Sequence, residues 1–442
     1  MKTMYTLFAV AVLAVPAIRA AAAPTPACVA HAAASLEALT HGDYAGARKD
    51  FDDAVAGKLD AARLEQVWKL LQGRFGAYRS HGAMGQKSFA GHAAAASTLS
   101  FANMQLGFVV ACDAQDKIST YRFVPADMLA ATAVQARAEA GGVRVLPLDV
   151  PTPVGPLHGA LTLPAGTGPF PAMVLVAGSG PHDMDETVGP NKPFRDIAEG
   201  LARAGIASLR YDKRTFDYPQ GSAGLAIDTE VTDAAVAAAH LLAQQQGIDP
   251  KRVFVLGHSL GGMMAPRIGQ DDPQLAGLVL MAAPARPLLD VSAEQVRELG
   301  AREQATAAQL AAREQAIAAE QKKLADADPR HPPAGMFAGA SQAYWMSLQR
   351  YDQVATAKAL AMPMLILQGG SDFQVSPTRD FARWQQALAG RPHTTFHRYP
   401  GLSHLFMPAG KTGTPADYQR PAQVDTQVIA DIAAWVKAQP AR

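Results

Sequence analysis

A turn built around a serine, between a strand and a helix, constrains this chain more than any other stretch. Four apolar residues at 253–256 are typical of a buried strand, and they run into Gly-His-Ser-Leu-Gly-Gly and then a helix. A serine in such a turn is held in a strained conformation, and only glycine leaves room at its flanks. We therefore predict a nucleophile at Ser259, with the backbone N–H of Leu260 pointing at any oxyanion formed there. A glycine-rich turn without chemistry is the alternative.

Composition limits the classes of protein that remain open. The chain has 442 residues, 49% hydrophobic and 18% charged, which indicates a globular protein of more than one domain. A formal net charge of +1 gives no argument for nucleic acid or an anionic membrane as partner. Four histidines near the N-terminus lack ligand-like spacing to acids or thiols, so we expect no metal site; they are His31, His41, His81 and His92. Serine chemistry needs no organic cofactor either.

Residues 1–23 have the pattern of a secretory signal peptide. A positive start precedes an apolar run at 7–15 that is too short to span a bilayer, and alanines follow at the cleavage positions. We expect a periplasmic or secreted protein without stable membrane insertion. In an oxidising compartment the only two cysteines, Cys28 and Cys112, form a bridge. Two buried free thiols are the alternative.

Residues 24–140 are predicted to form a small α+β domain. The expected elements are three helices at 30–39, 44–55 and 60–72, and two strands at 101–112 and 117–124. The two strands flank a short polar turn, which is typical of a hairpin. A linker helix at 133–142 is expected to lead into the second domain.

Residues 143–442 are predicted to form a doubly wound α/β domain. Buried strands alternate with helices, as in a mainly parallel sheet, after an antiparallel pair at 145–151 and 157–163. At 285–360 the alternation fails, and a stretch with strong helix propensity replaces it. We expect this insertion to form a helical cap, with Tyr344 and Trp345 in the substrate pocket. A solvated helical hairpin far from the chemistry is the alternative.

A serine nucleophile needs a base, and the base needs an orienting acid. Asp372 directly follows a buried strand at 365–368, and His404 lies in the loop beyond a last edge strand. Because the carboxyl ends of parallel strands meet at one edge of a sheet, we expect Ser259, Asp372 and His404 to form a catalytic triad. His258 adjoins the serine across the strained turn, so we expect it to be a supporting residue.

The second oxyanion donor is expected in the glycine-rich loop after the strand at 172–177. The N–H of Ser179 is the first choice and that of Gly180 the second, because Pro181 has no N–H to donate. Gly180 is also expected to line the substrate pocket. The acids that follow are interpreted as a solvated or arginine-paired loop in preference to a cation site; they are Asp183, Asp185 and Glu186.

Five segments together resemble the bacterial EstD-like carboxylesterases of the α/β-hydrolase superfamily. They are Gly178–Asp183, Arg210–Arg214, Gly257–Gly262, Gln368–Asp372 and Gly401–Phe406. The chain order of serine, acid and histidine is also that of the superfamily. The resemblance implies an α/β-hydrolase fold and a carboxylesterase that acts on short-chain, small-molecule esters through an acyl-enzyme. A thioesterase or a serine peptidase with the same triad is the alternative.

The N-terminal domain resembles a small domain of unknown function found ahead of certain bacterial hydrolases and related to the NTF2-like fold. The residues that carry the resemblance are Gly42-Asp43-Tyr44, Trp68 and Gly76, followed by the hairpin. Domains of this fold often pair or hold apolar ligands, which implies a homodimer. An alternative of a different class is therefore a ligand-binding or assembly protein that works through this domain.

Overall fold

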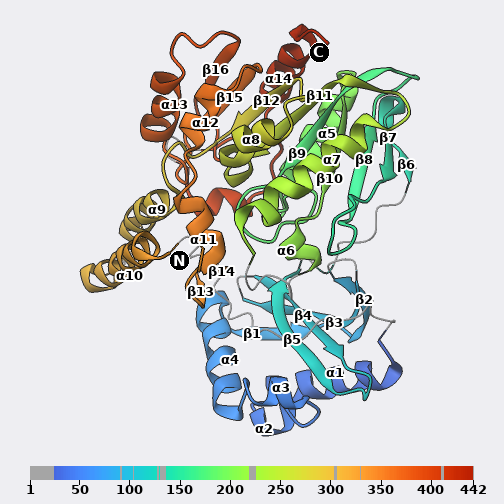
Figure 1. The fold of residues 1–442 in the computed structure, drawn as a ribbon. Helices are drawn as coiled ribbons and strands as arrows, with labels where there is room; N and C mark the ends of the chain where they lie inside the picture. The colour runs from blue at the N-terminus through green and yellow to red at the C-terminus, as the bar shows by residue number, and fades with distance from the viewer. Residues whose placement is uncertain are drawn as a thin grey trace. The chain divides into compact units, whose positions relative to one another are not determined.

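The computed structural model describes residues 24–441, apart from 90–91, 103, 127–128, 130–135, 219–224, 303–305, 329 and 410–412 (Figure 1). The described residues form two compact units, with the boundary between Ala133 and Val134. The part before it is called the N-terminal unit and the part after it the C-terminal unit. Within the described ranges, every helix is too short or too polar to cross a membrane.

The N-terminal unit packs helices on an antiparallel sheet. Its helices are α1 (Pro26–Thr40), α2 (Tyr44–Ala47), α3 (Asp53–Ala56) and α4 (Ala61–Phe75). Its strands are β1 (Tyr78–His81), β2 (Gly85–Phe89), β3 (His92–Phe101), β4 (Gln105–Cys112) and β5 (Ile118–Pro125). The strand order is β1-β3-β4-β5, with β2 paired to β3. Leu36 of α1, Trp68 of α4 and Phe108 of β4 share one buried core, so the small α+β domain predicted from the sequence is present.

Two predicted boundaries in this unit are wrong. The helix expected over 44–55 is divided into α2 and α3, because the side chain of Asp52 accepts a hydrogen bond from the N–H of Val55 and starts a new helix there. The strand expected over 101–112 is also divided, since β3 ends at Phe101 and β4 begins at Gln105. The predicted hairpin of this strand with the next is confirmed by the antiparallel pairing of β4 and β5.

The predicted linker helix at 133–142 is wrong over its described residues. They form a short strand, β6 (Arg137–Ala138), and a 3₁₀ turn, η2 (Ala140–Gly142). Gly141 and Gly142 have φ angles of 77° and 78°, which an α-helix cannot contain. β6 pairs with the next strand, so these residues extend the sheet of the C-terminal unit. The predicted signal peptide at 1–23 lies outside the described residues.

The C-terminal unit is built on a nine-stranded sheet in the order β16-β15-β12-β11-β9-β10-β8-β7-β6. Its strands after β6 are β7 (Arg144–Pro147), β8 (Gly159–Leu163), β9 (Phe170–Val176), β10 (Ala207–Tyr211), β11 (Ile248–His258), β12 (Gly277–Met281), β15 (Met364–Gly369) and β16 (Thr394–Tyr399). β9, β10, β11, β12, β15 and β16 run parallel, whereas β7 and β8 form the predicted antiparallel pair. This pattern confirms the predicted α/β-hydrolase sheet.

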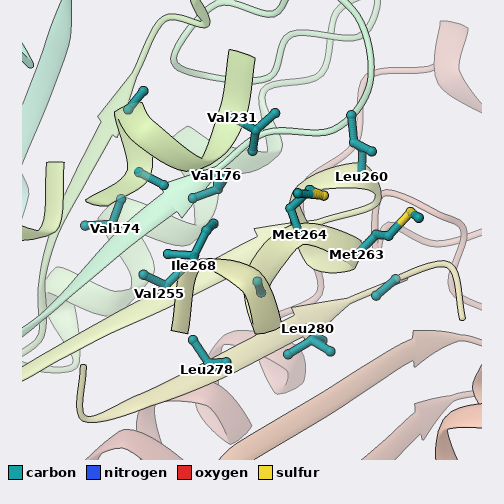
Figure 2. Packing of buried hydrophobic residues seen from close by; sticks show 14 of the residues in the cluster. Val174, Val176, Val231, Val255, Leu260, Met263, Met264, Ile268, Leu278 and Leu280 are labelled. Carbon is teal, nitrogen blue, oxygen red and sulfur yellow. The ribbon is translucent and has the colours of Figure 1, made fainter. Parts of the chain in front are cut away.

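Helices cover both faces of this sheet. They include α5 (Pro193–Arg203), α6 (Arg214–Asp217), α7 (Asp233–Ala243), α8 (Leu260–Asp271), α13 (Ala382–Ala387) and α14 (Thr426–Ala438), with a π-helical turn η4 (Asp228–Thr232) before α7. Successive residues of a strand point to opposite faces. Val174 and Val176 accordingly pack with α7 and α8, as Figure 2 shows in part, while Met173 and Leu175 pack with α5 and α14. The sheet is therefore buried on both sides.

The predicted helical insertion lies between β12 and β15. It contains α9 (Leu288–Arg302), α10 (Ala307–Asp326), a small hairpin of β13 (Met336–Phe337) and β14 (Ala340–Ser341), α11 (Gln342–Gln349) and α12 (Gln353–Ala359). Gln295 of α9 donates from Nε2 to the carbonyl oxygen of Gln374 at 2.8 Å, and Ser341 donates from Oγ to that of Leu225 at 2.6 Å. The insertion therefore contacts the loop that follows β15 and the segment ahead of η4.

A disulfide joins Cys28 of α1 to Cys112 at the end of β4. The bridge expected from the sequence is thus formed, and the alternative of two free thiols is wrong. Cys28 lies in the first turn of α1, where its backbone N–H is also bound by Thr25. The bond fixes the start of the helical layer to the sheet.

We expect Cys112→Ser to destabilise the N-terminal unit by about 4 kcal/mol, because a disulfide that closes a loop of this length removes considerable entropy from the unfolded chain. Thermal unfolding should show an earlier transition of this unit, and a reducing agent should move the wild type in the same direction. Equal melting temperatures for the wild type with and without reductant would contradict the assignment.

Candidate active site

Ser259 lies in a strained turn between β11 and α8. Its φ and ψ angles are 52° and −117°, outside the favoured regions for a residue with a side chain, which costs about 1–3 kcal/mol. The turn is held from both sides, by hydrogen bonds of 2.9 Å from the N–H of Ser259 to the oxygen of Met281 and from the N–H of Met263 to the oxygen of Ser259. Ser259 is partly exposed although both chain neighbours are buried. The turn therefore presents the serine hydroxyl to a ligand.

The glycines on either side of the serine are required by the backbone packing. A Cβ atom at Gly257 would lie 2.1 Å from the oxygen of Gly261, and a Cβ at Gly261 would lie 2.1 Å from the oxygen of Val176 in β9. Both obstacles are main-chain atoms that cannot rotate away. The expectation that only glycine fits at the flanks of Ser259 is therefore met.

His404 and Asp372 form a buried hydrogen-bonded pair. The distance from His404 Nδ1 to Asp372 Oδ2 is 2.7 Å. Asp372 Oδ2 also accepts from Gln368 Nε2 at 2.9 Å, and its Oδ1 accepts from the N–H groups of Gln374 and Val375 at 2.8 and 2.9 Å. A carboxylate held by these donors fixes the imidazole, and because Nδ1 donates to it, Nε2 carries the lone pair.

His258 connects the serine turn with the loop of His404. Its Nε2 lies 2.9 Å from the carbonyl oxygen of His404, and the centroids of the two rings are 4.6 Å apart. Its Nδ1 lies 2.9 Å from Oε1 of Glu186. The interpretation of His258 as a supporting residue agrees with these contacts. Ser259 and the His404–Asp372 pair therefore lie on adjoining loops at the carboxyl edge of the sheet.

The sequence interpretation did not find the position of Glu186. Asp185 is paired with Arg210 at 2.8 Å, as expected for an arginine-paired loop. Glu186, the next residue, is buried at 2% exposure and binds the N–H of Gly178 at 2.6 Å in addition to His258. A run of three acids in four residues gives no signal of which one turns inward. The backbone of Glu186, with φ at 51°, is what directs this side chain away from its neighbours.

The two predicted oxyanion donors lie beside the serine turn. A Cβ atom placed on Gly178 would be 3.2 Å from Cβ of Ser259, so the loop after β9 passes directly over the serine. Ser179 and Gly180 follow at once, and both are exposed. Leu260 is the first residue of α8, where a backbone N–H has no partner within the helix. Their roles as donors, and that of Gly180 in the substrate pocket, stay predictions.

Tyr344 and Trp345 lie in α11 of the insertion and are buried. Nε1 of Trp345 donates to the oxygen of Phe337 at 2.7 Å, and the two rings of Tyr344 and Trp345 are in edge contact at 5.5 Å. Burial, and then the charge of Glu230, raise the pKa of the Tyr344 hydroxyl. Both side chains belong to the same apolar cluster as Leu260. This packing does not test their predicted role in a substrate pocket.

One further group of side chains has the composition of a metal site. The ligand atoms of His158, Asp212 and Asp217 all lie within 4.8 Å of one another. His158 Nδ1 is 3.2 Å from Asp217 Oδ1, and burial followed by the negative charge of Asp217 raises the pKa of Asp212. This proximity alone carries no metal assignment, and the expected absence of a metal site stays a prediction.

Comparison with known proteins gives two family matches and a close relative. Residues 191–408 match the family described as serine aminopeptidase, S33, and residues 32–120 match the family described as a protein of unknown function (DUF3887). The chain is 33% identical over 401 residues to Esterase EstD of Thermotoga maritima, covering 91% of this chain and 93% of the relative.

Two solved structures show a more distant similarity to this chain. The esterase domain of a Rhodothermus marinus protein is 17% identical, with 67% of this chain and 98% of that chain covered and a TM-score of 0.42. Est1E of Butyrivibrio proteoclasticus is 13% identical, with 66% and 99% covered and a TM-score of 0.42. The assignment below rests on the sequence relative and not on these more distant structures.

We expect Gly261→Ala to destabilise the C-terminal unit by about 3 kcal/mol or more, because the added methyl group meets fixed backbone oxygens. Gly73→Ala is the matched control, since Gly73 lies in helix α4 with nothing within 4 Å of the new Cβ, and it should stabilise by about 0.5–1 kcal/mol. Melting temperatures of both variants test the packing at the serine turn. A Gly261→Ala protein as stable as the wild type would contradict it.

Proposed function

The chain belongs to the EstD-like carboxylesterases of the α/β-hydrolase superfamily and is a serine hydrolase, and on that premise we propose that it is an exported esterase of short-chain acyl esters that works through Ser259, His404 and Asp372. The observation that carries the proposal is the pair of buried hydrogen bonds that meet at His404. Asp372 holds its ring at 2.7 Å, and His258, next to Ser259, is bound to its carbonyl oxygen at 2.9 Å.

Acylation uses the lone pair on Nε2 of His404. This nitrogen takes the proton of the Ser259 hydroxyl as the serine oxygen attacks the ester carbonyl carbon. The negative charge that develops on the carbonyl oxygen is stabilised by the N–H groups of Leu260 and Ser179. Asp372 keeps the imidazole in the required tautomer and compensates its positive charge. The proton then passes from His404 to the alcohol that leaves, and the acyl group remains on Ser259.

Deacylation repeats the same proton transfers with water. His404 takes a proton from a water molecule that attacks the acyl carbonyl, and the same two N–H groups bind the second oxyanion. Collapse of this intermediate returns the proton to Ser259 and releases the carboxylic acid. These steps require a small-molecule ester, water and groups of the chain itself.

The substrate is proposed to lie between the loop of Gly180 and the helical insertion. Support comes from the hydrogen bond that joins Gln295 of the insertion to Gln374, two residues after Asp372. Tyr344 and Trp345 then act as the apolar wall that sets the preferred chain length. A serine peptidase is the second candidate function, and the match of residues 191–408 to the serine aminopeptidase family favours it over a thioesterase.

Export to the periplasm or the medium is part of the proposal. Its support is the signal-like pattern of residues 1–23 together with the disulfide between Cys28 and Cys112, a bond that persists in oxidising compartments. The NTF2-like relationship of the N-terminal unit and the homodimer that it implies stay predictions. The same applies to the alternative of a ligand-binding or assembly protein.

We expect Ser259→Ala to abolish ester hydrolysis while leaving stability nearly unchanged, because the substitution removes one hydroxyl; loss of a triad member costs about 10⁶ in kcat. A panel of acyl esters from short to long chains, run beside a thioester and a peptide substrate, measures activity and preference together. Ser208→Ala is the matched control, a hydroxyl buried in β10. Activity retained by Ser259→Ala would exclude the proposed nucleophile.

The role of the insertion is tested with Trp345→Ala. If the ring contacts the acyl or alcohol group, the variant should shift preference among chain lengths by about 1–3 kcal/mol, with the pH profile unchanged. If the ring only fills the core, the variant should lose about 3–5 kcal/mol of stability and turn over every ester more slowly by a similar factor. Chain-length preference and melting temperature measured on the same preparation separate the two.

A further inference from the structure

Both ring nitrogens of His258 face hydrogen-bond acceptors. Nδ1 lies 2.9 Å from a carboxylate oxygen of Glu186, and Nε2 lies 2.9 Å from the backbone carbonyl oxygen of His404. A carbonyl oxygen has no proton to donate, and Oε1 of Glu186 already accepts from the N–H of Gly178. With Glu186 ionised, as its lowered pKa indicates, both bonds can form only if His258 carries a proton on each nitrogen. The ring is then an imidazolium ion within the body of the protein.

The charges around His258 agree with this protonation state. Burial lowers the pKa of His258, but the charge and hydrogen bond of Glu186 and the carbonyl of His404 outweigh it, so the net shift is upward. Burial likewise raises the pKa of Glu186, and the charge and hydrogen bond of His258 reverse the shift. The other titratable groups beside the pair are His404, whose ring centroid lies 4.6 Å from that of His258, Asp372, whose charge raises the pKa of His258, and His182, which acts on Glu186.

Glu186 extends this contact to the loop of the proposed oxyanion donor. Glu186 accepts a hydrogen bond from the N–H of Gly178 at 2.6 Å. The carbonyl oxygen of Gly178 in turn accepts one from Nζ of Lys213 at 2.8 Å. Lys213 is itself buried and paired with Glu230 at 3.2 Å. Both backbone groups of Gly178 are therefore held by buried charges, and the next residue in the chain is Ser179.

We propose that Glu186 and protonated His258 form a positioning pair that fixes the oxyanion loop at Gly178 to the loop of the catalytic histidine. The inference rests on the proposed function, because it concerns the geometry of the same site. Neither residue touches the substrate. Their effect is to hold the N–H of Ser179 and the ring of His404 at a constant separation around Ser259. Preorganised donors of this kind act mainly on the transition state, so the pair supports kcat more than substrate binding.

The sign of the pH dependence follows from the two shifts. His258 has a raised pKa, so its contribution is complete below about pH 6.5, the ordinary value for histidine, and is lost as the pH rises through its pKa in the folded protein. Glu186 has a lowered pKa, so its contribution is complete above about pH 4.3 and is lost as the pH falls through its folded value. The pair is therefore intact from the folded-state pKa of Glu186, which lies below its ordinary value, up to the folded-state pKa of His258, which lies above its ordinary value.

The decisive variant is Glu186→Gln. The amide keeps the size of the side chain and removes the charge, so His258 loses its second proton at a lower pH. When the neutral ring keeps its proton on Nε2, an amide oxygen at position 186 faces the unprotonated Nδ1, so two acceptors oppose each other. When the amide is instead turned so that its NH₂ group donates to Nδ1, the N–H of Gly178 loses its acceptor. We expect kcat to fall about 10- to 100-fold with little change in KM, since small displacements of a catalytic group have effects of this size.

The pH profile distinguishes positioning from simple destabilisation. The loss in Glu186→Gln should deepen as the pH rises through about 6.5, where a histidine without its carboxylate partner becomes neutral, and should narrow again at the higher pH at which the wild-type ring loses its proton. Asp185→Asn is the matched control, since it removes a carboxylate paired with Arg210 from the same loop. It should lower the melting temperature and leave the shape of the profile unchanged. A Glu186→Gln profile that superimposes on the wild-type profile would overturn the proposal.

A spectroscopic measurement tests the protonation of His258 without relying on activity. The ring nitrogens of the wild type labelled with ¹⁵N-histidine are recorded by NMR, and the His258 signals are identified by their absence in His258→Gln. Two protonated nitrogens at about pH 7.5, where free histidine is mostly neutral, are the expected result. A neutral ring at that pH would overturn the inference. An inactive wild type with a charged His258 would instead refute the proposed esterase function alone.

Discussion

The contact of two backbones, where the first turn of α8 crosses the ends of β9 and β11, governs the geometry of the site. Gly257 and Gly261 allow main-chain atoms to approach more closely than any side chain would permit, and Ser259 between them is held with a positive φ. Because the obstacles are carbonyl oxygens of β9 and of α8, the turn cannot relax unless one of these elements moves. The serine is therefore fixed by elements that are buried on every side, and the loops around it adjust to that position.

The parallel sheet then determines which loops can reach the serine. β9, β11 and β15 are hydrogen-bonded within one sheet and point the same way, so the segments after them emerge at one edge. These segments carry Gly178, Ser259 and Asp372. The loop after β16 adds His404. Buried charged side chains are paired near this edge, as Lys213 is with Glu230 at 3.2 Å, so removing one partner would leave an uncompensated buried charge.

Much of this arrangement could be predicted from the sequence because it depends on local patterns. Buried runs of apolar residues located the parallel strands, and polar residues directly after those runs located Asp372 and His404. The side of the loop that Glu186 faces could not be predicted, since it is decided by a backbone angle and by a partner 72 residues away. The break between α2 and α3 could not be predicted either. The surrounding residues favour a continuous helix, and that propensity does not show that Asp52 caps a new helix. Gly141 and Gly142 fit the end of a helix by sequence alone, but their positive φ angles belong to a turn that follows an edge strand.

The disulfide of the N-terminal unit also sets an order of events for an exported chain. Under the proposed export, Cys28 would leave the translocation channel first, and its partner would follow 84 residues later. Both cysteines lie before the boundary at residue 133, so the covalent bond can close while the strands of the C-terminal unit are still being delivered. Domains that emerge first generally fold first. The N-terminal unit can thus become a finished, cross-linked body before the sheet that carries Ser259 exists.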